Sequence, residues 1–209
     1  MQLIGMLDSP YVRRVAISLQ LLGLPFEHRS LSVFRTFDEF QRINPVVKAP
    51  TLVCDSGTVL MDSTLILQYA EAMAAPRRLM PGGVAQLERA LRRIGLALAA
   101  CEKSVQIVYE RGLRPPEKLH EPWVHRVTGQ LLAAFDGLER EYAGSVPAFD
   151  AGTILQPELT SAVTWHFVQQ MLPEVVEAAR CPRLAALSAA AEALPAFKAA
   201  PHGAGTVNP

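Results

Sequence analysis

The pattern of apolar residues changes near residue 76, and this change constrains the fold more than any other feature of the sequence. Before it, short runs of strand type alternate with segments in which apolar residues recur at helical spacing. After it the spacing is almost purely helical, and the intervening stretch is rich in proline and glycine. The sequence therefore predicts a mixed domain over residues 1–75, a linker at 76–83 and an all-helical domain over 84–200.

The first part predicts a βαβαββα order of elements. Its last two strands are joined by Asp55-Ser56-Gly57, which is a strong signal for a tight hairpin turn. The expected strands span 2–6, 26–31, 51–54 and 58–61, and the expected helices span 10–22, 36–42 and 63–75. We expect the last of these helices to bury Leu65, Ile66, Tyr69 and Met73.

The second part predicts long helices with narrow apolar seams. Over 87–108 and 124–142, apolar residues return at alternating intervals of four and three. The two seams should pack as antiparallel neighbours, because the stretch 112–122 contains too many helix breakers to continue one helix. The segment 159–172 is apolar enough to be a buried central helix, and we expect the residues from Pro201 onward to be frayed.

Charge and composition exclude several classes of function. Twenty basic and twenty acidic residues cancel, so no bulk field favours nucleic acid or an anionic membrane as a partner. No secretory signal and no stretch of ~20 apolar residues is found, which predicts a soluble, cytoplasmic protein. Cys54, Cys101 and Cys181 are too few and too scattered for a disulfide framework, and the histidines lack metal-ligand spacing, so we expect no metal.

Ser9-Pro10 opens the first expected helix. Serine is a preferred N-cap and proline suits the first helical position, so capping alone explains the pair about as well as a functional role does. The functional interpretation adds that a hydroxyl at the positive end of a helix dipole can donate a hydrogen bond to a bound thiolate. Lowering a thiol pKa from about 8.5 by two units requires ~2.7 kcal/mol, which one charge-assisted hydrogen bond and a dipole can supply.

Lys48-Ala49-Pro50 precedes the strand expected at 51–54. A proline before a strand is mundane and a lysine is usually solvated, so this phrase alone favours no function. A cis peptide bond before Pro50 would turn the Ala49 backbone outward, where an extended peptide can pair with it. Lys48 would then lie where it meets a terminal carboxylate.

Asp62-Ser63 opens the helix expected at 63–75. Either residue can cap that helix, and capping is the simpler interpretation. The same helix start, with its free N–H groups and the Ser63 hydroxyl, is also suited to a carboxylate, while Asp62 can neutralise an adjacent α-amino group. Together the three phrases suit an anionic tripeptide that carries a thiol.

The chain resembles the glutathione S-transferases over nearly its whole length. The mixed part looks like their thioredoxin-like domain and the rest like their all-helical domain, and Asn44-Pro45 ahead of the lysine fits the family's Asn-Pro-x-x-Lys-x-Pro phrasing. The resemblance implies glutathione as co-substrate and no metal. It implies these roles: Ser9 at the thiolate, Pro50 as the cis-proline, Ala49 at the cysteinyl backbone, Lys48 at the glycine carboxylate, and Asp62 with Ser63 at the γ-glutamyl group.

The resemblance is strongest to the serine-type classes, such as tau, theta and zeta, because the classes that exchange thiols and disulfides carry cysteine in place of Ser9. A capping box common at the family's central helix is not intact here, since Glu158 and Ser161 fall at about its positions. The family also implies a homodimer, in which the second helix of the glutathione domain and the long helix meet across a two-fold axis.

An electrophile pocket is expected between the two domains. Its candidate walls, each explained equally well by ordinary packing, are Tyr11, Val105, Tyr109 and Trp165. The sequence leaves open whether Arg111, or the Arg13-Arg14 pair near Ser9, contacts a substrate.

The leading interpretation is a glutathione transferase that conjugates glutathione to an apolar electrophile. One alternative is a glutathione-dependent isomerase of the zeta (maleylacetoacetate isomerase-like) type, which requires cations such as Arg13 and Arg14 in its pocket. The other is a non-catalytic interaction module, which need not bind glutathione. Retention of the residues assigned to glutathione disfavours the interaction module.

Overall fold

The computed structural model describes residues 1–144 and 148–208. Contacts divide the chain into two compact units, and the first consists of Met1–Met80, Phe149–Leu155 and the segment from Glu192 onward. This first unit contains the β-sheet and is called the sheet unit; the other is called the helical unit. The sheet unit is therefore assembled from three separate parts of the chain.

The sheet has four strands in the order β2-β1-β3-β4. β1 pairs in parallel with β2 and antiparallel with β3, and β3 pairs antiparallel with β4. The bounds are β1 Gln2–Ile4, α1 Pro10–Leu22, β2 Glu27–Arg29, α2 Phe37–Ile43, β3 Thr51–Val53, β4 Val59–Met61 and α3 Ser63–Ala74. The predicted βαβαββα order is confirmed.

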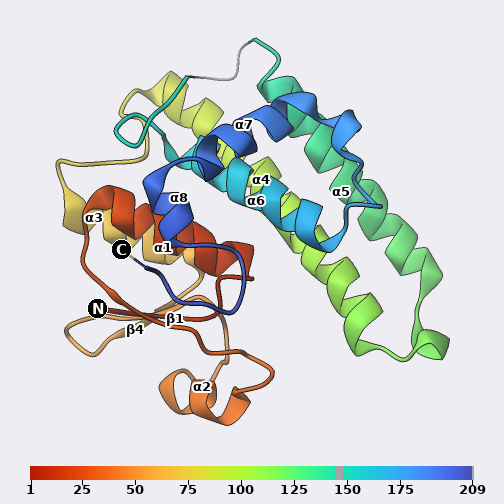
Figure 1. Ribbon diagram of the computed structural model, residues 1–209, viewed down its shortest axis with the longest axis horizontal. Coiled ribbons are helices and arrows are strands. Elements are labelled where there is room, and N and C mark those ends of the chain that lie inside the picture. Colours follow the sequence, from red (N-terminus) through yellow and green to blue (C-terminus); the bar gives the residue numbers. More distant parts are fainter. Residues whose placement is uncertain (145–147, 209) are drawn as a thin grey trace. The chain divides into compact units, whose positions relative to one another are not determined.

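Helices α1 and α3 pack against each other on one face of this sheet, and α2 lies on its other side (Figure 1). The face of α3 that is buried differs from the predicted one. Ile66 is fully buried as expected, but its buried neighbours on the helix are Leu67 and Ala70. The prediction was wrong for three residues that are 57%, 37% and 43% exposed, namely Leu65, Tyr69 and Met73. Because α3 carries apolar residues around most of its circumference, their spacing alone did not identify the inner face.

Arg13 of α1 binds the C-terminal segment to the sheet unit. Its guanidinium, only 2% exposed, pairs with both carboxylate oxygens of Glu192 at 2.6 and 2.7 Å. Its Nε donates to the Ala200 carbonyl at 2.8 Å, and its charge lies 5.7 Å from the ring centroid of Phe197. All the hydrogen bonds described for the Arg13 side chain go to this segment, which includes the short helix α8 (Pro195–Ala199).

The residues after α8 are also held by specific hydrogen bonds. Ser30 donates to the Ala204 carbonyl at 2.7 Å, and the Asn208 N–H donates to the Ala199 carbonyl at 2.8 Å. The His28 ring bonds to the Gly5 carbonyl through Nε2 at 2.7 Å and accepts the Val207 N–H at Nδ1 at 3.1 Å. The expectation that the chain frays from Pro201 was therefore wrong. Its cause is a set of partners from the first thirty residues, which no local pattern reveals.

The helical unit comprises Pro81–Ala148 and Gln156–Ala191. Its two longest helices run antiparallel and are joined by a short connection, as predicted (Figure 1). The predicted central helix is confirmed as α6, because most of its residues are buried. The elements are α4 Val84–Leu113, the 3₁₀ turn η1 Pro116–Lys118, α5 Glu121–Glu141, α6 Gln156–Met171, the 3₁₀ turn η2 Ala178–Arg180 and α7 Pro182–Glu192.

A polar network joins these helices where the family often has a capping box. Glu158 accepts from Arg93 at 3.1 Å, and the Tyr142 hydroxyl donates to Ser161 at 3.1 Å. The Arg93 guanidinium lies 4.6 Å from the centroid of the Tyr142 ring. Burial, and secondarily the charge of Glu158, raises the pKa of Tyr142 far above its usual range, so the hydroxyl stays a donor.

Within the described residues, no helix combines the length and apolar character needed to cross a membrane.

Candidate functional site

Ser9 is the N-cap of α1. Its backbone is extended (φ −74°, ψ 122°), its carbonyl accepts the Arg13 N–H at 2.9 Å, and its Oγ accepts the Val12 N–H at 3.4 Å. The last bond is long, so the cap is weak. A hydroxyl that accepts one bond still has its own proton to donate. The geometry therefore allows Ser9 to cap the helix and to donate to a ligand at the same time.

The buried side chain of Asn44 holds the loop that contains Lys48, Ala49 and Pro50. Asn44, only 3% exposed, accepts the Val46 N–H at 3.0 Å and donates to the Thr51 hydroxyl at 2.8 Å. Thr51 in turn donates to the Lys48 carbonyl at 2.7 Å. The Ala49–Pro50 peptide bond is cis, as expected. Sequence reasoning assigned no role to the Asn44 side chain, although an asparagine that bonds the backbone two residues ahead is a recognisable turn signal.

Asp62 and Ser63 begin α3 in an unusual backbone conformation. Asp62 has φ 71°, which is rare for a residue with a side chain, and its carboxylate accepts the Thr64 N–H at 2.9 Å. Such a conformation costs on the order of 1–3 kcal/mol and persists at ligand clamps and other functional sites. Ser63, 3% exposed, is the first helical residue. The positive end of the α3 dipole thus coincides with the serine hydroxyl.

Arg14 lies directly behind Ser63. Its Nη1 donates to the Ser63 hydroxyl at 3.1 Å and approaches the Thr64 hydroxyl at 3.4 Å, and the side chain is 2% exposed. The sequence leaves open a role for Arg13 and Arg14 as cations of an electrophile pocket. Arg13 is instead committed to Glu192. Arg14 places a buried positive charge at the α3 N-terminus, where it strengthens a site for a carboxylate.

Three contacts join the three sequence phrases. Arg14, one turn and a half beyond Ser9, reaches Ser63. Lys48 Nζ lies 3.9 Å from Asp62 Oδ2, with both side chains about half exposed. At Gly5 (φ 135°) an added Cβ would lie 2.7 Å from Val12 Cγ2 and 3.1 Å from the Ala49 Cβ, so glycine allows the loop before Ser9 to approach Ala49. The structure thus gathers a hydroxyl, a cation, a carboxylate and a helix start in the sheet unit.

The candidate electrophile-binding residues lie in both units. Tyr11 is in the first turn of α1 and is partly buried. In the helical unit, Val105 is partly buried on α4, Tyr109 is 43% exposed on the same helix, and Trp165 is 4% exposed on α6. The Trp165 ring packs edge-on against Phe135 at 5.5 Å between centroids, which favours a role in the core.

Arg111 is engaged by a neighbouring residue of the helical unit. Its guanidinium forms an ion pair with Glu174, and both side chains are exposed. This contact lowers the pKa of the Glu174 carboxyl. An exposed ion pair contributes little to stability, so Arg111 remains able to pair with another charged group. The buried guanidinium of Arg13 does not have this freedom.

Comparison with known proteins reveals one consistent likeness. The family model described as "Glutathione S-transferase, N-terminal domain" matches residues 3–78. Glutathione S-transferase 1 of Dianthus caryophyllus is 26% identical over 175 residues, which covers 78% of each chain. Because this second match covers 78% of the chain, it extends beyond the residues that the family model matches.

Solved structures extend the likeness to the fold. A glutathione S-transferase from Methylobacterium radiotolerans, in complex with glutathione sulfonate, superposes with a TM-score of 0.86 at 27% identity and covers 94% of this chain and 92% of its own. A maleylacetoacetate isomerase from Methylobacterium extorquens, with bound malonate and glutathione, has a TM-score of 0.72 at 21% identity over 96% and 95% of the two chains. At that identity the second comparison speaks for the fold alone. The predicted thioredoxin-like domain followed by helices is confirmed.

Proposed function

This chain belongs to the glutathione S-transferase family, and we propose that it binds glutathione, stabilises the thiolate and transfers it to an apolar electrophile. The observation that carries this proposal is a set of three contacts that link the parts of the candidate site. Gly5, in the loop before Ser9, approaches Ala49; Arg14 reaches Ser63; and Lys48 lies near Asp62. None of these groups is a strong nucleophile or a metal cluster. Their chemistry is that of holding a charged peptide and activating its own thiol.

In this proposal each end of the tripeptide meets an opposite charge. The γ-glutamyl carboxylate accepts from Ser63 and the first N–H groups of α3, with the Arg14 charge behind them. Asp62 faces the α-amino group and Lys48 faces the glycine carboxylate. The ion pair between these two side chains, at 3.9 Å, is exposed and therefore weak enough to open when the peptide binds. The Ala49 backbone pairs with the cysteinyl residue, which directs the sulfur toward Ser9.

Ser9 then acts as a donor to sulfur and not as a nucleophile. Its O–H donates to the thiolate, and the α1 dipole adds to the preference for the ionised form. An ionised thiol at neutral pH attacks the electrophile directly, forming the carbon–sulfur bond while the leaving group departs or the conjugate is protonated by solvent. All three cysteines of the chain are buried thiols, which suits the reducing cytoplasm where we place this detoxifying reaction.

We expect calorimetric titration to show binding of both glutathione and S-methylglutathione. Ser63→Ala should weaken the binding of both by about 1–3 kcal/mol, because the bound carboxylate loses a hydrogen-bond partner in a buried setting. Ser56→Ala, in the exposed turn between β3 and β4, is the matched control and should bind as the parent does. Absence of binding by either peptide would overturn the proposal and favour an interaction module, whereas an unaltered Ser63→Ala affinity would remove Ser63 from the glutathione site.

An isomerase of the zeta type is the second candidate. Its fold likeness is clear, but Arg13 and Arg14 are each 2% exposed and engaged within the sheet unit, so they do not supply the cations that a diacid substrate requires. A transferase acting on apolar electrophiles is therefore favoured.

We also propose that the protein forms a homodimer through α3. Leu65, Tyr69 and Met73 recur every four residues and form one exposed apolar stripe on this helix. Exposed apolar stripes of this kind mark interfaces between proteins. The stripe favours α3, the third helix of the sheet unit, over the second helix that the family resemblance suggested.

Leu65→Glu is expected to convert the dimer to a monomer in sedimentation velocity, because it buries an unpaired carboxylate at the interface. Val46→Glu, at a loop position that is 61% exposed in the same unit, should leave the sedimentation coefficient unchanged. A parent protein that sediments as a monomer, or a Leu65→Glu variant that remains dimeric, would contradict this assembly.

A further inference from the structure

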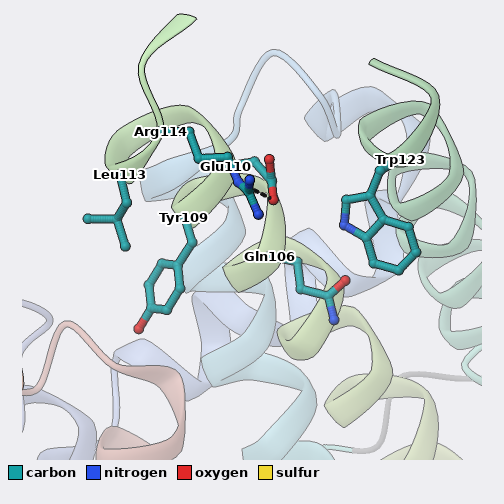
Figure 2. Close-up of a pocket in the computed structure, with 6 residues that line it drawn as sticks. All are labelled: Gln106, Tyr109, Glu110, Leu113, Arg114 and Trp123. Atoms are coloured by element: carbon teal, nitrogen blue, oxygen red, sulfur yellow. Dashed lines mark ion pairs between the residues drawn. The ribbon is translucent and has the colours of Figure 1, made fainter. Parts of the chain in front are cut away.

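A pocket in the helical unit contains none of the residues assigned to glutathione, and Tyr109 is the one residue of its lining that is also a candidate wall of the electrophile pocket. It lies where the C-terminal end of α4 meets the start of α5 and has a volume of about 490 Å³ (Figure 2). Its walls come from two helices that are joined by the segment containing η1. The residues that line it are Gln106, Tyr109, Glu110, Leu113, Arg114 and Trp123.

Two residues that line this pocket each carry an acceptor oxygen for which the described part of the chain provides no donor. Glu110 is 9% exposed; its Oε1 pairs with Arg114 Nε at 2.8 Å, but its Oε2 is buried and has no hydrogen-bond partner among the described residues. Gln106 shows the same pattern, since its Nε2 donates to Glu102 at 3.0 Å while its buried Oε1 likewise lacks a described partner. A buried acceptor without a donor destabilises the folded protein, and a charged acceptor does so more strongly.

Gln106 and Glu110 lie on one face of α4. Residues four apart on a helix are neighbours, with about 5–6 Å between their Cβ atoms, so one ligand can reach both. Across the pocket, Trp123 projects from α5 toward α4, with its indole nitrogen on the side of Glu110 (Figure 2). The site therefore offers a carboxylate oxygen and an amide oxygen opposite an aromatic face.

We propose that this pocket binds a small, flat organic cation that donates N–H bonds, such as an amidinium or a primary ammonium on an aromatic body. Its N–H groups satisfy Glu110 Oε2 and Gln106 Oε1, and its ring and charge lie against Trp123, where a cation is attracted by the aromatic face. Arg114 already shows that this carboxylate pairs with a planar cation. Because its side chain is 55% exposed, Arg114 can turn into solvent when a second cation enters.

The opposite charge is disfavoured by the same geometry. An anion would face the carboxylate of Glu110 and the carbonyl oxygen of Gln106, and only Arg114 would attract it. Comparing the affinities of a cation and an anion of equal shape therefore distinguishes a cation-binding site from a pocket that binds any apolar ring. Benzamidine and benzoate form such a pair.

We would titrate the ¹⁵N-labelled protein with each compound and follow the indole N–H signals of its two tryptophans. Benzamidine should shift the Trp123 signal with saturation at a Kd of about 1 mM or below. The signal of Trp165, which is buried against Phe135, should stay unchanged. Benzoate should bind at least about ten-fold more weakly, a difference of ~1.4 kcal/mol.

Glu110→Gln should weaken benzamidine binding at least about ten-fold, because it removes the charge and retains the shape. Glu117→Gln, an exposed carboxylate of η1 in the same connection, is the matched control and should bind as the parent does. If Glu110→Gln does not fold, Gln106→Leu provides the second variant, with an expected loss of several-fold. The proposal is overturned if benzoate matches benzamidine, if the variants bind normally, or if benzamidine does not saturate the Trp123 shift. Because the assay follows Trp123 alone, its outcome is independent of glutathione binding.

Discussion

Ser9→Ala is expected to raise the pKa of the bound glutathione thiol by about two units while leaving the affinity for glutathione nearly unchanged. The variant removes the O–H that donates to the thiolate and leaves the peptide-binding groups in place. Turnover at pH 7 should then fall by ~25-fold, because the ionised fraction of the thiol drops from about three-quarters to about 3%, and it should recover as the pH rises through the new pKa. Ultraviolet absorbance of the thiolate in the complex, recorded against pH, measures the shift directly.

The capping role of Ser9 must be separated from this effect. Loss of the N-cap lowers stability by ~0.5–2 kcal/mol, although the 3.4 Å bond to Val12 suggests the low end of that range. Ser9→Gly preserves the helix start at a cost of a few tenths of a kcal/mol, and Ser9→Thr retains the hydroxyl. We expect the glycine variant to behave like alanine and the threonine variant to keep substantial activity. An unchanged pH–rate profile in Ser9→Ala would remove Ser9 from the mechanism.

Arg13→Met is expected to lower the free energy of unfolding by about 3 kcal/mol or more. It leaves the Glu192 carboxylate without the bidentate partner at 2.6 and 2.7 Å and removes the donor to the Ala200 carbonyl. Methionine retains most of the apolar volume, so the loss reflects the charge and its hydrogen bonds. Urea unfolding followed by circular dichroism gives the change.

The matched control is Arg29→Met in the same unit. Arg29 pairs with Glu39 at 2.9 Å, but both side chains are partly exposed, at 34% and 42%. Such pairs typically contribute less than ~1 kcal/mol. Equal stability losses in the two variants would show that the Arg13 cluster is no stronger than an ordinary surface pair.

Sequence periodicity predicted the secondary structure well because its boundaries are marked locally. α1 spans Pro10–Leu22 as expected, since Ser9 caps its start and Gly23 (φ 72°) ends it in a left-handed conformation. Each predicted strand is one to three residues too long, because an apolar run does not show where ladder hydrogen bonds stop. The inner face of α3 was not predictable because apolar residues occupy both of its faces.

The candidate site could be predicted only where its residues act through local geometry. Ser9, Asp62 and Ser63 are recognisable because each begins a helix. The positions of Arg13 and Arg14 were not, because their partners lie 179 and 49 residues away and nothing near them in the chain indicates burial. The side-chain role of Asn44 falls between these cases, since one of its partners, Val46, is local and the other, Thr51, lies across the loop.

The return of the C-terminal segment to the sheet unit determines when that unit can be finished during biosynthesis. Residues 1–80 emerge from the ribosome before the helical unit, yet the acceptors of Arg13 at Glu192 and Ala200 are translated after that unit. Synthesis of the intervening 81–191 takes on the order of ten seconds. Throughout that interval Arg13, whose guanidinium is buried in the folded protein, lacks the Glu192 carboxylate with which it pairs. The helical unit is therefore complete before the unit that precedes it, and the usual order of vectorial folding is reversed.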